Sequence, residues 1–188
     1  MKDGLGILRQ VLRGILIAVL IGTVAIVVLF IGRPLHGDRH GAALTLNDIN
    51  ELTQSIEAFE SEYGKLPDTA SLDFELEGPQ AAGFITVLLG KEAPQSNIQN
   101  RRQITFLALR ISRNKRHGGL VFSSDNKPEG IYDRWGNPLR VILRSPGETT
   151  LTVPHAGKQV TTSKPFVVLS KGADGKWDTK DDVISKTK

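Results

Sequence analysis

A short stretch near the C-terminus carries most of the side chains that could hold a metal ion. The segment from Ser170 to Val183 reads SKGADGKWDTKDDV, and its carboxylates are those of Asp174, Asp178, Asp181 and Asp182. Calcium takes six to eight oxygen ligands from carboxylates, backbone carbonyls and water. The spacing allows one loop to close on itself and present several oxygens inward. It does not match an EF-hand, which needs alternating acidic or amide residues and a terminal Glu.

A solvated turn is the alternative for this stretch. Lys171, Lys176 and Lys180 leave the segment with one net negative charge, which weakens cation binding. Nothing beside the aspartates resembles a nucleophile or a proton shuttle. Ser123, Ser124, Asp125 and His155 are residue types found in hydrolases, but no Gly-x-Ser-x-Gly frame surrounds them. We therefore expect no enzymatic activity and no small-molecule substrate.

The N-terminal part of the chain contains a long apolar run. Residues 14–32 carry no charged side chain, and Arg13 and Arg33 bracket them. A helix of this length spans roughly 28 Å, close to the hydrocarbon thickness of a bilayer. A signal peptide is the alternative, but its apolar region is shorter and it ends in small residues at the cleavage site. The run ends in LFIGRPLHG, so a retained transmembrane helix is predicted.

The charges that flank this run predict its orientation. Residues 1–13 carry Lys2, Arg9 and Arg13 against Asp3, whereas residues 33–40 carry two arginines against Asp38. The larger positive excess favours a cytoplasmic N-terminus. Residues 1–13 are then a basic cytoplasmic leader, and residues 33–188 lie outside the cytoplasmic membrane. The chain has no cysteine, which excludes disulfides and thiolate metal sites.

The elements that follow predict an α+β domain. Apolar residues spaced by three or four predict an amphipathic helix over about 43–63. A break at Pro34, Gly37 and Gly41 precedes it, Thr45 is its predicted N-cap, and Gly64 ends it. Short helices are expected at 81–90 and 102–111. Strands are expected at 119–124, 138–145, 148–154 and 166–172, separated by turns at residues 126–130, 136–138 and 145–147. This order favours a small antiparallel sheet packed on the long helix.

Three motifs follow the predicted membrane segment in a fixed order. Tyr63-Gly64-Lys65-Leu66-Pro67 ends the long helix, DRWGNP stands at residues 133–138, and residues 172–175 with 181–183 contain the aspartates near the C-terminus. Together they resemble the type IV pilin-like proteins, and most closely the major pseudopilin of type II secretion, in which an Asp-x-Trp-Gly-x-Pro turn precedes a C-terminal calcium loop. The resemblance implies a pilin-like fold.

The resemblance also implies site residues. The side chains of Asp174, Asp181 and Asp182 would bind a structural calcium ion, with backbone carbonyls near Lys171 and Lys176 and with Asp178 as an additional carboxylate. Family members are cut after a Gly that follows a basic leader, which implies a processing site between Gly14 and Ile15. The acidic residue that the family places five residues after the cut is absent, and Val19 stands there.

The resemblance implies a structural subunit of a type II secretion filament, or of a related pilus-like filament, that aids protein export. Such a subunit is anchored in the inner membrane by one helix, with its domain in the periplasm, and assembles with other pseudopilin subunits through that helix. Two alternatives remain: a static binding module on a membrane tether, and a pilin-like component of DNA uptake. The last draws on the basic residues Arg101, Arg102, Arg110, Arg113, Lys115, Arg116 and His117. They have little aromatic interleaving, so a solvated face is favoured over nucleic-acid binding.

Overall fold

The computed structural model describes residues 36–94 and 97–187, with side chains from residue 39 onward. The chain divides into two compact units, Met1–Gly37 and Asp38–Lys188, and the second contains the core. The leader, the apolar run at 14–32, and Gly14, Ile15 and Val19 lie outside the described residues. Across the described ranges, no helix is long and apolar enough to cross a membrane.

The long helix α2 extends from His36 to Tyr63. The predicted start at about residue 43 is therefore wrong, and the predicted break at Gly37 and Gly41 is helical. Glycine disfavours a helix interior, but Gly41 has a packing role, because a Cβ there would lie 2.9 Å from Cζ2 of Trp135. The predicted stop is confirmed: Gly64 has a φ of 68°, and its N–H donates to the Glu60 carbonyl at 2.7 Å.

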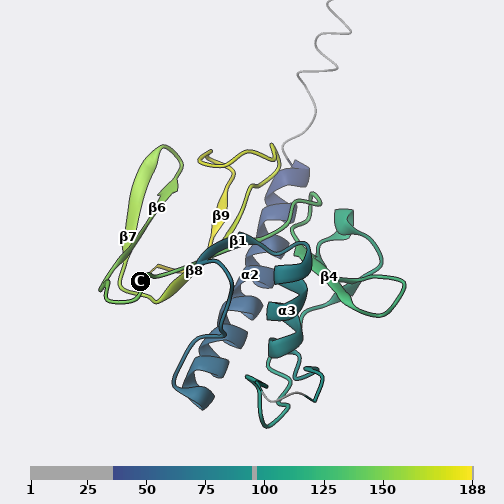
Figure 1. The fold of residues 1–188 in the computed structure, drawn as a ribbon. Helices are drawn as coiled ribbons and strands as arrows, with labels where there is room; N and C mark the ends of the chain where they lie inside the picture. Colours follow the sequence, from purple (N-terminus) through teal and green to yellow (C-terminus); the bar gives the residue numbers. More distant parts are fainter. Residues whose placement is uncertain (1–35, 95–96, 188) are drawn as a thin grey trace, which may run out of the picture. The chain divides into compact units, whose positions relative to one another are not determined.

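The apolar stripe of α2 forms the centre of the core. Ile49, Leu52, Ile56 and Phe59 are all fully buried, as their spacing predicts. Leu46 departs from the prediction and is 37% exposed. The stripe packs with α3 (Pro79–Leu88) and with the inner faces of the sheets. Figure 1 shows α2 in the middle of the domain, with α3 and β4 on one side of it in this view and β8 and β9 on the other.

Within the described residues, the strands form three small sheets. The largest has the order β1-β5-β8-β9 and is antiparallel throughout. Its members are β1 (Asp73–Glu75), β5 (Arg140–Leu143), β8 (Phe166–Ser170) and β9 (Val183–Ile184). The second sheet contains β2 (Ile111–Ser112), β3 (Gly119–Phe122) and β4 (Pro128–Tyr132), and β6 (Leu151–His155) and β7 (Lys158–Thr162) form a hairpin. The α+β class is thus confirmed, with one parallel pair, β2–β3, that the sequence did not predict.

Most of the predicted short elements are present, and two predictions are wrong. Residues 102–111 are not a helix: Leu107 and Leu109 are buried on alternate positions, which is the period of an extended chain. The predicted turn at 126–130 is also misplaced, because Pro128 and Gly130 belong to β4. Gly130 permits a close approach of backbone, since a Cβ there would lie 2.4 Å from the Leu76 carbonyl oxygen.

Candidate functional site

The aspartate-rich stretch is a connection inside a sheet rather than a free tail. It leaves β8 at Ser170 and returns in β9 at Val183, and these two residues are paired in the antiparallel ladder. The ends of the loop are therefore fixed by the sheet, and residues 171–182 form what we call the Asp loop. Figure 1 shows it in yellow, above β9 in this view.

Two carboxylates of the Asp loop converge on Thr179. The Thr179 hydroxyl lies 2.7 Å from Oδ1 of Asp181 and 3.2 Å from Oδ1 of Asp182. The second oxygen of Asp181 accepts the Asp174 backbone N–H at 2.9 Å, and that of Asp182 accepts the Asp178 N–H at 2.7 Å. The loop is thus closed by its own carboxylates. Thr179 has a central position that the sequence did not predict, because a threonine between Asp178 and Lys180 is not a distinctive signal.

The two central carboxyl groups have different pKa shifts. Burial raises the pKa of Asp182 above its ordinary value, although backbone N–H groups of Asp178 and Thr179 oppose this. Burial acts in the same direction on Asp181, but hydrogen bonds from the Thr179 hydroxyl and from backbone N–H groups outweigh it and lower the pKa. Of these two carboxyl groups, Asp181 is therefore the one that the loop holds more firmly in its charged form.

The side chains of the other two predicted aspartate ligands have other partners. Asp174 Oδ1 accepts the Lys176 N–H at 2.8 Å, and Asp178 Oδ1 accepts the N–H of Gly157 in the β6–β7 hairpin at 2.7 Å. The Lys171 side chain forms an ion pair with Glu75 at 2.7 Å. The structure therefore brings Asp181 and Asp182 together, while Asp178 holds the hairpin against the loop.

The donor chemistry of the Asp loop suits a hard cation. Carboxylate and carbonyl oxygens are the ligands that calcium prefers. Among the residues that the structure describes, however, no group of three or more carboxylate or imidazole side chains is placed to hold a metal. Calcium binding would require the carboxylate of Asp174 to turn from the Lys176 N–H toward Asp181 and Asp182.

The turn at residues 133–138 supports the start of the Asp loop. Asp133 is fully buried, and its Oδ1 accepts the backbone N–H groups of Trp135 and Asn137, each at 2.9 Å. Its Oδ2 accepts the Ser170 hydroxyl at 2.7 Å and the Asn137 side-chain amide at 3.1 Å. The same amide donates to the Gly172 carbonyl at 2.9 Å. The turn and the loop therefore form one hydrogen-bonded unit, of which the sequence revealed only the turn.

Trp135 of this turn packs on α2. Its ring lies over Gly41, and the backbone N–H of the neighbouring Arg134 donates to the Thr45 hydroxyl at 3.2 Å. Thr45 is thus a buried contact in the middle of the helix rather than its N-cap. Burial raises the pKa of Asp48, one turn further along α2, although the Arg134 guanidinium 3.5 Å away opposes this shift.

The basic residues that suggested a phosphate-binding face are divided between the two ends of α2. Arg102 forms an ion pair with Glu62 in the last turn of the helix. The backbone carbonyl of His117, in contrast, accepts a hydrogen bond from the Arg134 side chain. Arg134 contacts Thr45 and Asp48, nearer the N-terminal end of the helix. Residues 48 and 62 of one helix are about 21 Å apart. The cluster that the sequence suggested is therefore not one continuous surface.

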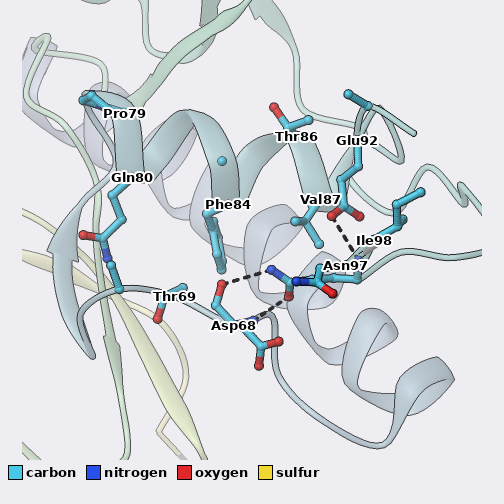
Figure 2. Close-up of a pocket in the computed structure, with 14 residues that line it drawn as sticks. Asp68, Thr69, Pro79, Gln80, Phe84, Thr86, Val87, Glu92, Asn97 and Ile98 are labelled. Atoms are coloured by element: carbon cyan, nitrogen blue, oxygen red, sulfur yellow. Dashed lines mark hydrogen bonds between the residues drawn. The ribbon is translucent and has the colours of Figure 1, made fainter. Parts of the chain in front are cut away.

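A pocket of about 360 Å³ lies between α3 and the segments that precede and follow it. Figure 2 shows Phe84 and Val87 on the α3 side, with Asp68 and Glu92 on the facing loops. Glu92 accepts the backbone N–H groups of Gln99 and Asn100, and the Gln99 side chain bonds the Asp68 backbone. The polar groups of the pocket thus hold the surrounding loops together.

The residue types found in hydrolases do not form one site. Ser123 and Asp125 follow β3, and His155 ends β6.

Comparison with known proteins gives no relative. No family model matches the chain, and neither the curated proteins nor the solved structures contain a significant match.

Proposed function

We propose that this protein is a membrane-anchored, pseudopilin-like structural subunit of a type II secretion filament or a related pilus-like filament, and that it has no enzymatic activity. The observation that supports this most is the spatial arrangement of the three motifs. The Tyr63–Pro67 motif ends α2, while the turn at 133–138 and the Asp loop are joined by the bond from Asn137 to Gly172. The motifs therefore organise the two ends of one long helix.

In this proposal the apolar run at 14–32 anchors the chain in the inner membrane, with the leader in the cytoplasm and residues 33–188 in the periplasm. The described domain follows directly, because α2 begins at His36. Helices of neighbouring subunits would pack through the anchor, and addition of subunits would push cargo outward. Removal of the leader between Gly14 and Ile15 is part of this proposal.

We propose that calcium stabilises the Asp loop, with Asp181 and Asp182 as its first ligands. Both carboxylates already meet at Thr179, and Asp174 is bonded to Asp181 through its backbone. The side chain of Asp174 and the carbonyls near Lys171 and Lys176 would complete the ligand set. The ion would fix the connection between β8 and β9, and would have no catalytic role.

Two other functions are compatible with the domain. A static binding module would use the apolar run only as a tether, and Val19, in the place of the family's acidic residue, favours this alternative. A DNA-uptake role would need a continuous basic surface. The separation of Arg102 from His117 along α2 speaks against it.

Intact-mass analysis of the protein purified from its native membrane separates the filament subunit from the tether. A filament subunit is expected to begin at Ile15 with a methylated amine, and to form crosslinked ladders through cysteines placed in the apolar run. A Gly14→Ala variant, which blocks cleavage, should lose the ladders. A native protein that begins at Met1 and gives no ladders would overturn the filament proposal and favour the tether.

A further inference from the structure

A tryptophan covers the first turns of α2. Trp135 is half-buried, and its ring lies so close to Gly41 that a Cβ there would be 2.9 Å from Cζ2. The Trp135 ring is thus fixed at the N-terminal end of the helix, with part of its surface exposed. A partly exposed Trp held by its neighbours is a typical contact residue at a boundary between water and an apolar phase.

Basic residues lie on the segments that adjoin the turn of this tryptophan and the first turns of α2. The 3-10 segment η1 (Lys115–His117) packs on the turn, since a Cβ at Gly136 would lie 3.5 Å from Cα of Arg116. Arg113 lies just before η1, and Arg39 lies in the first turns of α2; all three arginines are exposed. We call Arg39, Arg113, Arg116 and Trp135 the N-terminal rim.

The fold does not use the charges of Arg113 and Arg116. Lys115 between them pairs with Glu77 at 2.5 Å and with Glu129 at 3.0 Å, and Arg134 pairs with Asp48. Within the part of the chain that the structure describes, neither Arg113 nor Arg116 forms an ion pair. Their positive charges are therefore available to an external partner.

The covalent chain limits how far Arg39 of the rim can lie from the end of the apolar run. Gly32 ends that run, and Arg39 follows seven positions later. Even a fully extended chain of this length reaches only about 25 Å. Tryptophan is enriched at membrane interfaces, and arginines near a membrane surface are attracted to anionic headgroups. The Asp loop, which is bonded to the same turn, carries four aspartates and three lysines. Its net charge of −1 therefore offsets only a small part of the positive charge of the rim.

We propose that the N-terminal rim binds the anionic phospholipid headgroups around the protein's own membrane anchor. Arg113 and Arg116 pair with headgroup phosphates, and the exposed edge of Trp135 enters the interface. This binding holds the domain against the membrane rather than leaving it mobile on a tether. The proposal rests on the proposed membrane anchor. A single tryptophan favours a membrane over a single-stranded nucleic acid, which would need several stacking aromatics; duplex DNA is left to the competition test below.

Trp135 itself provides the measurement. The chain has two tryptophans, so Trp177→Phe leaves Trp135 as the only emitter. The full chain is reconstituted into vesicles of phosphatidylcholine, with or without phosphatidylglycerol, that contain a headgroup-labelled nitroxide lipid as quencher. Strong quenching is expected only in the anionic vesicles, with loss of this excess in high salt, which screens exposed charges.

The charge-removing variant is Arg113→Gln with Arg116→Gln, in the Trp177→Phe background. It should reduce quenching in anionic vesicles to the level in phosphatidylcholine. The matched control is Arg101→Gln with Lys127→Gln, which removes two exposed charges from other parts of the surface and should leave the quenching unchanged.

Flotation after an alkaline wash separates this inference from the anchor on which it rests. If flotation resists alkali but quenching is equal in the two lipids, or equal in the two double variants, the proposal for the rim is overturned and the proposed anchor stands. Alkali-sensitive binding that needs phosphatidylglycerol and both arginines supports the rim and overturns the anchor. Absence of any vesicle binding overturns both. Displacement of the rim from anionic vesicles by duplex DNA at equal phosphate concentration would assign it to nucleic acid and also overturn the proposal.

Discussion

The Ser170 hydroxyl donates a 2.7 Å hydrogen bond to Oδ2 of Asp133, although the two residues are 37 positions apart and both are fully buried. This bond connects the turn that holds Trp135 to the last residue of β8, from which the Asp loop leaves. Ser170 also accepts the Gly172 N–H at 3.0 Å. One buried carboxylate therefore determines the positions of both candidate functional segments.

Asp133→Asn is expected to destabilise the domain strongly. Oδ1 must stay an oxygen, because it accepts two backbone N–H groups, so the new amide would point at the Asn137 side-chain amide, which is also a donor. Loss of charge-assisted bonds to buried donors costs about 3 kcal/mol. Urea unfolding of residues 38–188, followed by circular dichroism, measures the change.

The control for this variant is Asp125→Asn, which alters an exposed carboxylate in the turn after β3. It should leave the free energy of unfolding unchanged within about 0.5 kcal/mol. Equal stability of the Asp133 and Asp125 variants would show that the buried network does not hold the loop.

The sequence predicted the parts of the site whose residues are neighbours in the chain. Asp133, Gly136 and Asn137 form a local turn, and local turn chemistry is readable from residue types. Ser170 is distant in sequence, and a single serine at a strand end carries no distinctive signal. The role of Thr179 was missed for the same reason, because it depends on how the loop folds back.

The long helix shows a similar limit. The stripe from Ile49 to Phe59 was predicted correctly, because the period of apolar residues reports the buried face. The start of α2 was placed too late, since Gly41 reads as a helix breaker unless the ring of Trp135 is known to lie over it. The prediction of a helix over residues 102–111 was wrong because a short apolar run does not by itself distinguish a helix from a strand.

Calcium is expected to raise the melting temperature of residues 38–188, and chelator to reverse the effect. Magnesium should have little effect, because it demands a tighter octahedral geometry than a flexible loop provides. A ligand that binds only the folded state stabilises it by mass action, by about 2.7 kcal/mol at a hundredfold excess over the dissociation constant. Differential scanning fluorimetry measures the shift.

The variant that tests this site is Asp181→Asn, which should abolish the calcium shift, and Asp125→Asn should retain it. A calcium shift of the same size in both variants would place the ion elsewhere. No shift in the unaltered protein would mean that Thr179 and the backbone N–H groups are the partners of these carboxylates under all conditions.

Gly172→Ala is expected to disrupt the Asp loop. Gly172 has a φ of 64°, and a Cβ there would lie 2.2 Å from the Asp181 carbonyl oxygen, so the backbone must move. Gly147→Ala is the matched control, since Gly147 has a φ of 87° and no atom within 4 Å of its Cβ position. Urea unfolding should show that the control loses only the conformational cost of about 1 kcal/mol. Gly172→Ala should lose clearly more stability than the control. Equal losses would show that the close approach has no energetic weight.

Gly83→Ala and Gly41→Ala should have different effects although both residues are helical. Gly83 is exposed in α3 with nothing near its Cβ position, so alanine should stabilise the domain by about 0.5–1 kcal/mol through helix propensity. Gly41→Ala should gain nothing, or lose stability, because its methyl group would displace Trp135. A red shift of Trp135 emission in the Trp177→Phe background would report that displacement, and an unchanged spectrum would argue against the contact.

The ion pair between Glu77 and Lys115 predicts a pH dependence. The hydrogen bond from Lys115 lowers the pKa of Glu77 below its ordinary value of 4.5, and the Tyr132 hydroxyl 3.0 Å away acts in the same direction. A depressed carboxyl pKa stabilises the fold above the unfolded value, and this contribution disappears as the pH falls through the folded value. Both side chains are 42% exposed, so the effect should stay below about 1 kcal/mol.

Urea unfolding of the unaltered domain and of Glu77→Gln, repeated from neutral pH to below pH 4.5, measures this contribution. The unaltered domain should be the more stable at neutral pH, and the difference should vanish on the acidic side. Added salt should reduce it at neutral pH, because both charges are partly exposed. A difference that persists unchanged below the lowered pKa of Glu77 would show that packing of the side chain, and not its charge, stabilises this contact.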